Sequence, residues 1–259
     1  MKNVCLITGA SGGLGKEFAY LFAKNGQNLV LVARSLDKLQ ALCEELQKSY
    51  GIQALAYQAD LTVDSEILNL YEWTKKQDLQ IDYLVNNAGF GDRQAFIGSN
   101  WARSRSLLDL NILALVHTTY LFGADMKERG FGRILNIASA AAFAGGPYMA
   151  LYYASKSFVL SFSEALYEEL KGTGVSVTAL CPGPTATEFE KNAHLNGSVM
   201  FSVLKPDSAP KVAELGFKAL MAGKAIQYSG LVTRSFSFAS RILPRSISRK
   251  IAMRVNKNQ

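Results

Sequence analysis

Thr8-Gly9-Ala10-Ser11-Gly12-Gly13-Leu14-Gly15 is the stretch that decides the fold. It follows a short apolar run at residues 4–7, and apolar residues recur after it at helical spacing as far as Gly26. Glycines between a strand and a helix let the backbone turn sharply and approach a pyrophosphate, whose charge the helix N-terminus then meets. The order predicts a site for a phosphate-bearing ligand. The spacing G-x-x-x-G-x-G departs from G-x-G-x-x-G, so a glycine-rich turn without a ligand stays an alternative.

The rest of the chain alternates short buried runs with helical patterns. We predict strands at residues 3–8, 29–32, 53–57, 82–85, 133–137, 175–180 and 226–229. The helices are predicted at residues 14–26, 36–50, 64–76, 101–127, 148–170 and 206–221. Such alternation means right-handed crossovers and a parallel sheet. The sequence therefore predicts an α/β fold, a doubly wound parallel sheet of Rossmann type with about seven strands and helices on both faces. We expect one catalytic domain at residues 1–230.

Composition sets broad limits on the class of protein. The chain has 259 residues, of which 49% are hydrophobic and 19% charged. We see no apolar run near 18 residues and no signal-peptide pattern, and we expect a soluble, cytoplasmic protein. Cys5, Cys43 and Cys181 are scattered without paired spacing or a histidine cluster. They are predicted to be buried thiols, and no metal site is expected.

The net charge of +7 is concentrated in the C-terminal part. Nine of the 28 basic residues and none of the 21 acidic ones lie after Glu214, which leaves a net charge of −2 before it. Nucleic acid is therefore not an expected partner. Within residues 236–256, Leu243, Ile247, Ile251 and Val255 recur every four residues among basic ones, which predicts a basic amphipathic helix in an extension at residues 231–259. This helix packs on its own domain or on a partner subunit, or it attaches to an anionic membrane surface.

Tyr152 and Lys156 lie four residues apart in a predicted helix, so they share one face. A free tyrosine ionises near pH 10, and a fixed cation favours the phenolate, which lowers that pKa. The pair predicts an acid–base site, although a half-buried ring beside a solvated lysine has the same spacing. Tyr153 also shares the face of Lys156, at a spacing of three.

The end of the second predicted strand carries Arg34 and no acidic residue. An acid at this position binds the ribose 2′-hydroxyl of NAD, whereas an arginine accommodates the 2′-phosphate of NADP. We therefore expect NADP(H) in preference to NAD(H), with a solvated arginine as the alternative.

Five motifs in order resemble the short-chain dehydrogenase/reductase family. They are the glycine loop, Asn86-Asn87-Ala88-Gly89, Ser139, Tyr152-x-x-x-Lys156 and Pro182-Gly183-Pro184-Thr185-Ala186-Thr187, and the resemblance covers roughly residues 3–230. It implies that Tyr152 is the general acid/base, that Lys156 lowers its pKa and binds the nicotinamide ribose, that Ser139 orients a carbonyl, and that Asn111 holds a relay water. The 13-residue separation from Ser139 selects Tyr152 over Tyr153.

The resemblance also implies a set of cofactor-binding residues around the strand ends. They are Gly9, Ser11, Gly13, Leu14, Gly15, Arg34, Asp60, Leu61, Asn87, Ala88, Gly89, Tyr152, Lys156, Pro182, Gly183, Thr185 and Thr187. Asp60 would otherwise pass as a helix cap. Family members that prefer NADP often have a basic residue just before the middle glycine, where this chain has Gly12, so the preference depends on Arg34.

The expected activity is reduction of a hydrophobic ketone, such as a 3-oxoacyl, steroid-like or other lipophilic carbonyl compound, or the reverse oxidation of an alcohol. A loop at residues 187–205 is predicted to cover the substrate as a lid. The candidate apolar walls are Phe90, Phe96, Phe143, Tyr148, Met149, Phe189, Met200 and Phe201. The family's habit predicts a homodimer or homotetramer. A catalytically silent regulator or scaffold that senses dinucleotides is the alternative function.

Overall fold

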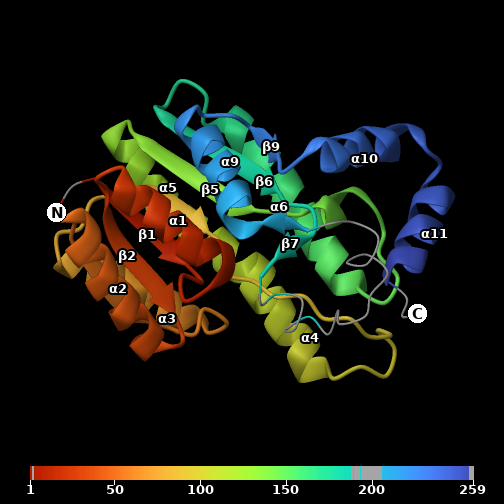
Figure 1. Cartoon of the computed structure of the whole chain (residues 1–259), viewed down its shortest axis with the longest axis horizontal. Helices are drawn as coiled ribbons and strands as arrows, with labels where there is room; N and C mark the ends of the chain where they lie inside the picture. Colours follow the sequence, from red (N-terminus) through yellow and green to blue (C-terminus); the bar gives the residue numbers. More distant parts are fainter. Residues whose placement is uncertain (2, 188, 190–192, 194–205, 257–259) are drawn as a thin grey trace.

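A seven-stranded parallel sheet forms the centre of the molecule (Figure 1). The computed structural model describes residues 1, 3–187, 189, 193 and 206–256. The strand order is β3-β2-β1-β4-β5-β6-β9. These strands are β1 (Val4–Thr8), β2 (Asn28–Ala33), β3 (Ala54–Gln58), β4 (Ile81–Asn86), β5 (Gly132–Ile137), β6 (Val175–Cys181) and β9 (Ile226–Tyr228). The predicted doubly wound parallel sheet is confirmed.

Helices cover both faces of this sheet, because successive side chains of a buried strand point to opposite faces. The helices with a continuous α-helical backbone are α1 (Gly13–Lys24), α2 (Leu36–Tyr50), α3 (Asp64–Lys76), α4 (Trp101–Leu108), α5 (Leu115–Arg129), α6 (Ala150–Glu169), α9 (Ala209–Met221), α10 (Leu231–Ile242) and α11 (Arg245–Asn256). Cys5 and Ile7 of β1 belong to the core beneath α1, α2 and α9, whereas Val4 and Leu6 belong to the core beneath α3 and α5. All three cysteines are buried and free, as predicted.

The predicted long helix at residues 101–127 is present but contains a π-helical segment, η1 (Asp109–Ala114), between α4 and α5. A π turn holds one more residue than an α turn and is frequent at functional sites. By length and composition, Trp101–Arg129 is apolar enough to cross a membrane. Its inner side, with Leu107, Phe122 and Met126, is part of the protein core.

The predicted single C-terminal helix at residues 236–256 is wrong, because the chain forms two helices there. α10 ends at Ile242, and α11 begins at Arg245. Pro244 lies between them, and Leu243 before it is extended, with φ −69° and ψ 139°. Proline disfavours helical backbone in the residue that precedes it, so the helix stops there. The two helices lie at the same end of the molecule (Figure 1).

Two short elements lie next to the sheet. A 3-10 turn, η2 (Ala140–Phe143), follows β5, and a two-stranded parallel pair is formed by β7 (Thr185–Ala186) and β8 (Asp207–Ser208). Most of the predicted lid at residues 187–205 lies outside the described residues. Of this segment the structure describes Thr187, Phe189 and Ala193.

Candidate active site

One large cleft lies beyond the carboxyl ends of the strands, and its cavity has a volume of about 1100 Å³. The strand order reverses between β1 and β4, which is where ligands bind in open α/β sheets. Sequence-predicted residues from both halves of the chain line this cleft. They are Gly9, Ser11, Gly13, Leu14, Arg34, Asp60, Leu61, Asn87, Ala88, Gly89, Ser139, Tyr152, Lys156, Pro182, Gly183, Thr185 and Thr187.

The glycine loop fits closely against the end of β4. Gly9 has a left-handed φ of 66°, and a Cβ there would lie 2.9 Å from the Ala88 Cα. Gly15 does not line the cleft, contrary to its predicted role as a cofactor contact. A Cβ on Gly15 would lie 2.3 Å from the Gly9 carbonyl oxygen, so the absence of a side chain at this position allows α1 to start close to the loop.

Asn87 and Thr8 fix the loop in this position. The Asn87 side-chain amide donates to the carbonyl oxygens of Thr8 at 2.9 Å and Gly9 at 3.1 Å. The Thr8 hydroxyl accepts from the backbone N–H groups of Asn87 and Ala88, each at 3.0 Å. These bonds leave the backbone of the loop pre-organised around the cleft, as pyrophosphate binding requires.

The cleft continues from the loop to Arg34 and Asp60, which follow β2 and β3. The Arg34 side chain is exposed, and no ion pair involving it is found in the part of the chain that the structure describes. Asp60 is not the cap of α3, whose N-cap is Val63. Its Oδ1 accepts from the backbone N–H of Thr62 at 3.0 Å and from the Thr62 hydroxyl at 2.8 Å. The exposed Arg34 guanidinium beyond β2 suits a 2′-phosphate, so the residues present fit NADP.

Ser139, Tyr152 and Lys156 meet at the opposite end of the cleft. Ser139 follows β5 and caps η2, where its hydroxyl accepts from the backbone N–H of Ala141. Tyr152 lies in the first turn of α6, and its hydroxyl is near enough to Ser139 for the serine side chain to lower its pKa. The Lys156 ammonium donates to the Ile137 carbonyl oxygen at 2.7 Å and lies 5.9 Å from the centroid of the Tyr152 ring.

Burial decides the protonation of the pair. It raises the pKa of Tyr152 to about 12, against the smaller lowering effect of the Ser139 hydrogen bond. Burial also lowers the pKa of Lys156 to about 8, while the nearby Cys181 acts in the opposite direction. The expected net lowering of the tyrosine pKa by Lys156 is therefore not found in this structure, because desolvation of the phenolate is the largest effect on it and Ser139 is the side chain that opposes it. At neutral pH Tyr152 is a neutral hydrogen-bond donor.

Asn111 lies behind the cleft and does not line it. Its side-chain amide donates to the Phe90 carbonyl oxygen at 2.9 Å and to the Ser155 hydroxyl at 3.2 Å, and its Oδ1 accepts from the Phe90 N–H at 3.0 Å. A Cβ on Gly89 would lie 2.9 Å from the Asn111 Oδ1 and 3.6 Å from the Lys156 Nζ. The π-helical segment thus brings Asn111 within reach of the loop beside Lys156.

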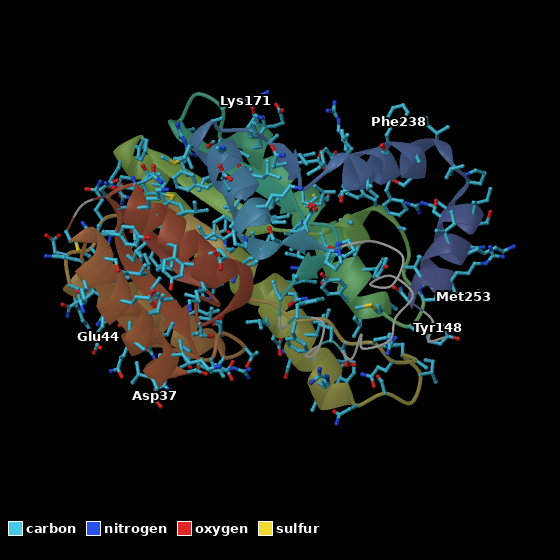
Figure 2. The ribbon with its side chains drawn as sticks, in the orientation of Figure 1. Asp37, Glu44, Tyr148, Lys171, Phe238 and Met253 are labelled. Carbon is cyan, nitrogen blue, oxygen red and sulfur yellow. The ribbon has the colours of Figure 1, made fainter. Side chains whose placement is uncertain are left out.

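Apolar side chains surround Tyr152 on the side away from the glycine loop. Phe90, Met149 and Phe189 line the cleft as expected, and the Phe189 ring lies 5.4 Å from that of Tyr152. Phe96, Phe143 and Tyr148 do not line it, and Tyr148 points away at the surface (Figure 2). Met200 and Phe201 lie outside the described residues.

Sequence reasoning missed the contribution of the C-terminal helices to this wall. Val232, Thr233 and Phe236 of α10 line the cleft, and so do Ile251, Ala252 and Val255 of α11. Ala252 belongs to the same apolar cluster as Tyr152 and Tyr153. The spacing of Ile251 and Val255 indicates only an amphipathic face, whereas Pro244, which separates α11 from α10, is the sequence signal for a second helix that can lie against the cleft.

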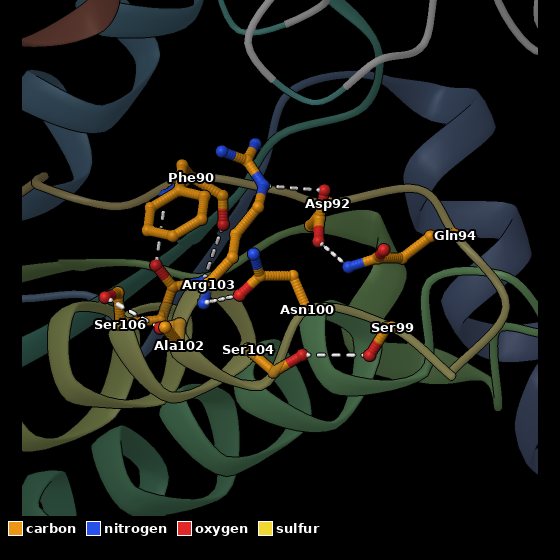
Figure 3. Close-up of polar contacts among 10 residues, drawn as sticks. Phe90, Asp92, Gln94, Ser99, Asn100, Ala102, Arg103, Ser104 and Ser106 are labelled. Carbon is orange, nitrogen blue, oxygen red and sulfur yellow. Dashed lines mark hydrogen bonds and ion pairs between the residues drawn. The ribbon is translucent and has the colours of Figure 1, made fainter. Parts of the chain in front are cut away.

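A second missed group comes from the start of α4 (Figure 3). Asn100, Ala102, Arg103 and Ser106 line the cleft. The Arg103 guanidinium lies 5.2 Å from the Phe90 ring centroid, and its Nε donates to the buried Asp92 at 2.9 Å. Asp92 also accepts a bond from the Gln94 side-chain amide, and the Asn100 side chain caps α4 by accepting from the Arg103 N–H. This network holds the Phe90 loop against α4.

Comparison with known proteins agrees with the geometry. Residues 3–196 match the short chain dehydrogenase family. The chain is 36% identical to 17-beta-hydroxysteroid dehydrogenase type 3 of Mus musculus over 74% of its length, and it spans only 63% of that relative. It is 30% identical to very-long-chain 3-oxoacyl-CoA reductase of Rattus norvegicus, over 98% of this chain and 79% of the relative.

A solved structure of a short-chain dehydrogenase from Sphingobium yanoikuyae in complex with NADPH superposes with a TM-score of 0.83 at 29% identity. The match covers 92% of this chain and 93% of the other. With a family match over most of its length and its motifs gathered around one cleft, the chain belongs to the short-chain dehydrogenase family.

Proposed function

We propose that the protein is an NADPH-dependent reductase of hydrophobic ketones, or the enzyme of the reverse alcohol oxidation. One observation carries the proposal. The Ser139 and Tyr152 side chains lie close together and line the cleft where it passes from the glycine loop to the apolar wall. A carbonyl oxygen placed there has two neutral donors directed at it, which stabilises the negative charge that grows during reduction.

Each residue of the site has a role in this proposal. NADPH, held by the glycine loop, Arg34 and Lys156, supplies the hydride when bound. Tyr152 donates its proton to the carbonyl oxygen as general acid, and Ser139 orients that oxygen. Asn111 fixes the Phe90 backbone beside Lys156 and is proposed to hold a relay water from there. Phe189 and Met149 cover Tyr152 and exclude bulk water from the reacting atoms.

The preference for NADP rests on Arg34. Its exposed side chain lines the cleft beyond β2, and the structural relative from Sphingobium yanoikuyae was solved with NADPH. A guanidinium recognises a phosphate by paired, charge-assisted hydrogen bonds.

The substrate class follows from the walls of the cleft and from the relatives. Apolar residues of the Phe90 loop, α6, α10 and α11 line the half of the cleft around Tyr152. Relatives named as a steroid dehydrogenase and a 3-oxoacyl-CoA reductase support a lipophilic carbonyl group on a large substrate. We propose this substrate class for a catalytic domain at residues 1–230, with α10 and α11 of the C-terminal extension completing the wall of the cleft.

A homodimer or homotetramer in the cytoplasm is part of the same proposal. Leu113 of η1, Tyr120 of α5 and Phe158 of α6 are exposed apolar side chains on the two long helices, and Phe158 stacks on Phe162. Exposed apolar surface of this kind marks contacts between proteins.

Tyr152→Phe tests the proposal, since it removes the acidic proton and keeps the ring. We expect ketone-dependent NADPH oxidation, followed by absorbance with a panel of lipophilic ketones, to fall by roughly 10²- to 10⁴-fold. NADPH binding by fluorescence and the melting temperature should change little. Tyr153→Phe is the matched control and should keep its maximal rate. Wild-type protein that binds NADPH without any turnover would instead favour the dinucleotide sensor.

A further inference from the structure

The outer surface of the two C-terminal helices is unusually apolar. Leu231, Phe238 and Ile242 of α10 are 80%, 66% and 69% exposed, and their spacings of seven and four place them on one side of the helix. Phe238 points away from the body of the molecule (Figure 2). α11 adds Ile247 and Met253, which are 44% and 40% exposed. Monomeric proteins rarely leave a row of large apolar side chains such as Leu231, Phe238 and Ile242 in water.

The same surface carries only positive charge. Arg234 on α10 is exposed beside this apolar stripe. Arg245, Arg249, Lys250 and Arg254 are the exposed basic residues of α11. The sequence holds no acidic residue after Glu214 to neutralise them. The buried side of α11, with Ser248, Ala252 and Asn256, already faces the protein, so the apolar and basic side chains are left outward.

We propose that the α10–α11 surface, defined by residues 231–256, docks on an anionic lipid membrane. Interfacial helices bury an apolar stripe at the headgroup boundary and place lysine and arginine among the headgroups. A second copy of the chain is disfavoured, because a two-fold contact would bring these unneutralised basic residues together. Nucleic acid does not explain the exposed Leu231, Phe238 and Ile242, which have no partner on a phosphate backbone.

The charge of the rest of the chain favours a single orientation. The residues up to Glu214 carry a net charge of −2, so an anionic surface attracts only the C-terminal end. α10 and α11 also line the cleft, through Phe236 and Ile251 among others. The docked protein therefore holds the apolar half of its cleft next to the bilayer. Delivery of a lipophilic ketone from the bilayer into this cleft rests on the proposed function, whereas docking of the α10–α11 surface on the membrane does not.

Vesicle sedimentation of the full chain tests the proposal. We expect wild-type protein to sediment with phosphatidylglycerol-containing vesicles at low salt, and not with pure phosphatidylcholine vesicles. Phe238→Ser with Ile242→Ser should weaken sedimentation about tenfold or more, and Arg249→Glu with Lys250→Glu should do the same. The matched controls change exposed residues of the same kind, apolar or basic, elsewhere on the molecule. They are Val63→Ser with Ile97→Ser, and Lys38→Glu with Lys48→Glu.

NADPH fluorescence shows that each variant is folded, so a loss of sedimentation cannot be ascribed to misfolding. Equal sedimentation of the control and α10–α11 variants would overturn the proposal, and so would wild-type protein that ignores anionic vesicles. Variants that change only the oligomer size by gel filtration would overturn it in favour of a contact between copies. Failure of ketone reduction would leave the sedimentation result unchanged, so the two proposals fail separately.

Discussion

The Tyr153 hydroxyl donates a hydrogen bond to the Asn256 Oδ1 at 3.1 Å, which joins the catalytic helix α6 to the end of α11. The Asn256 side-chain amide donates in turn to the Pro147 carbonyl oxygen at 3.0 Å. Asn256 is 1% exposed, so both bonds are shielded from water. The tyrosine that is not the proposed acid therefore holds α11 over the substrate half of the cleft.

Replacing Asn256 by Ala should loosen this wall. Loss of the amide leaves the Tyr153 hydroxyl and the Pro147 carbonyl unpaired, at a cost of about 1–3 kcal/mol. We expect the KM for a bulky hydrophobic ketone to rise by roughly 5- to 30-fold, with little change in NADPH affinity. Steady-state kinetics check the KM, and hydrogen exchange should show faster exchange of the α11 amides. Arg254→Ala, on the outer side of α11, is the control; an equal effect there would contradict the role of Asn256.

Arg34→Ala should shift the cofactor preference. A charge-assisted bond to a phosphate contributes about 1.5–3 kcal/mol, so the ratio of kcat/KM with NADPH to that with NADH should fall by roughly 10- to 100-fold. The exposed Lys38 on the following helix is the matched control as Lys38→Ala. An unchanged ratio in Arg34→Ala would exclude Arg34 as the phosphate partner.

Lys156 should make stability depend on pH in the alkaline range. Burial lowers its pKa to about 8, from an ordinary value of 10.5. Between these values the unfolded chain binds the proton and the folded one does not, so this contribution to the free energy of unfolding rises with pH. Across the window, wild type should gain at most about 3 kcal/mol relative to Lys156→Met. Urea unfolding at pH 7.5, 9 and 10 measures the difference in free energy of unfolding between the two proteins. The buried thiols affect both proteins equally at each pH, so their contribution cancels in this difference. A difference that stays constant with pH would contradict the assignment.

Asn136→Leu should destabilise the fold. Its fully buried amide donates to the Ser163 hydroxyl and its Oδ1 accepts from the Asn86 amide, each at 2.9 Å. The substitution removes both bonds and leaves polar groups unpaired in the core, which we expect to cost about 2–4 kcal/mol. Urea unfolding checks this value. Asn28→Leu, at the partly exposed start of β2, should cost much less; an equal loss would mean that the buried network contributes nothing special.

The sequence allowed the sheet and the phosphate end of the cleft to be predicted, because both depend on local patterns. Buried strands and the loop from Gly9 to Gly15 have short-range signals, and the structure places them as expected. The role of Gly15 could not be separated from those of its neighbours. Whether a glycine faces a ligand or another backbone depends on packing that spacing does not record.

The substrate end was predicted less well, because it is assembled from segments distant in the chain. The hydrogen bond between Tyr153 and Asn256 spans 103 residues, and no local pattern specifies it. The net rise of the Tyr152 pKa likewise depends on how deeply the ring is buried, whereas the spacing to Lys156 indicated only the charge. Pro244 was visible in the sequence, yet the regular apolar spacing around it suggested one helix.

The π-helical segment also sets the direction in which the side chains of α5 point. Its extra residue rotates α5 relative to α4, and Thr118 and Thr119 of α5 then reach the Asn86 side chain at 2.8 and 2.9 Å. Deleting one residue from Asp109–Ala114 would restore an unbroken α-helix and turn the later side chains by about 100°. The same extra residue thus brings Asn111 to the Phe90 loop and sets the register in which Asn86 finds its hydrogen-bond partners. A change in the length of this segment would therefore alter both contacts together.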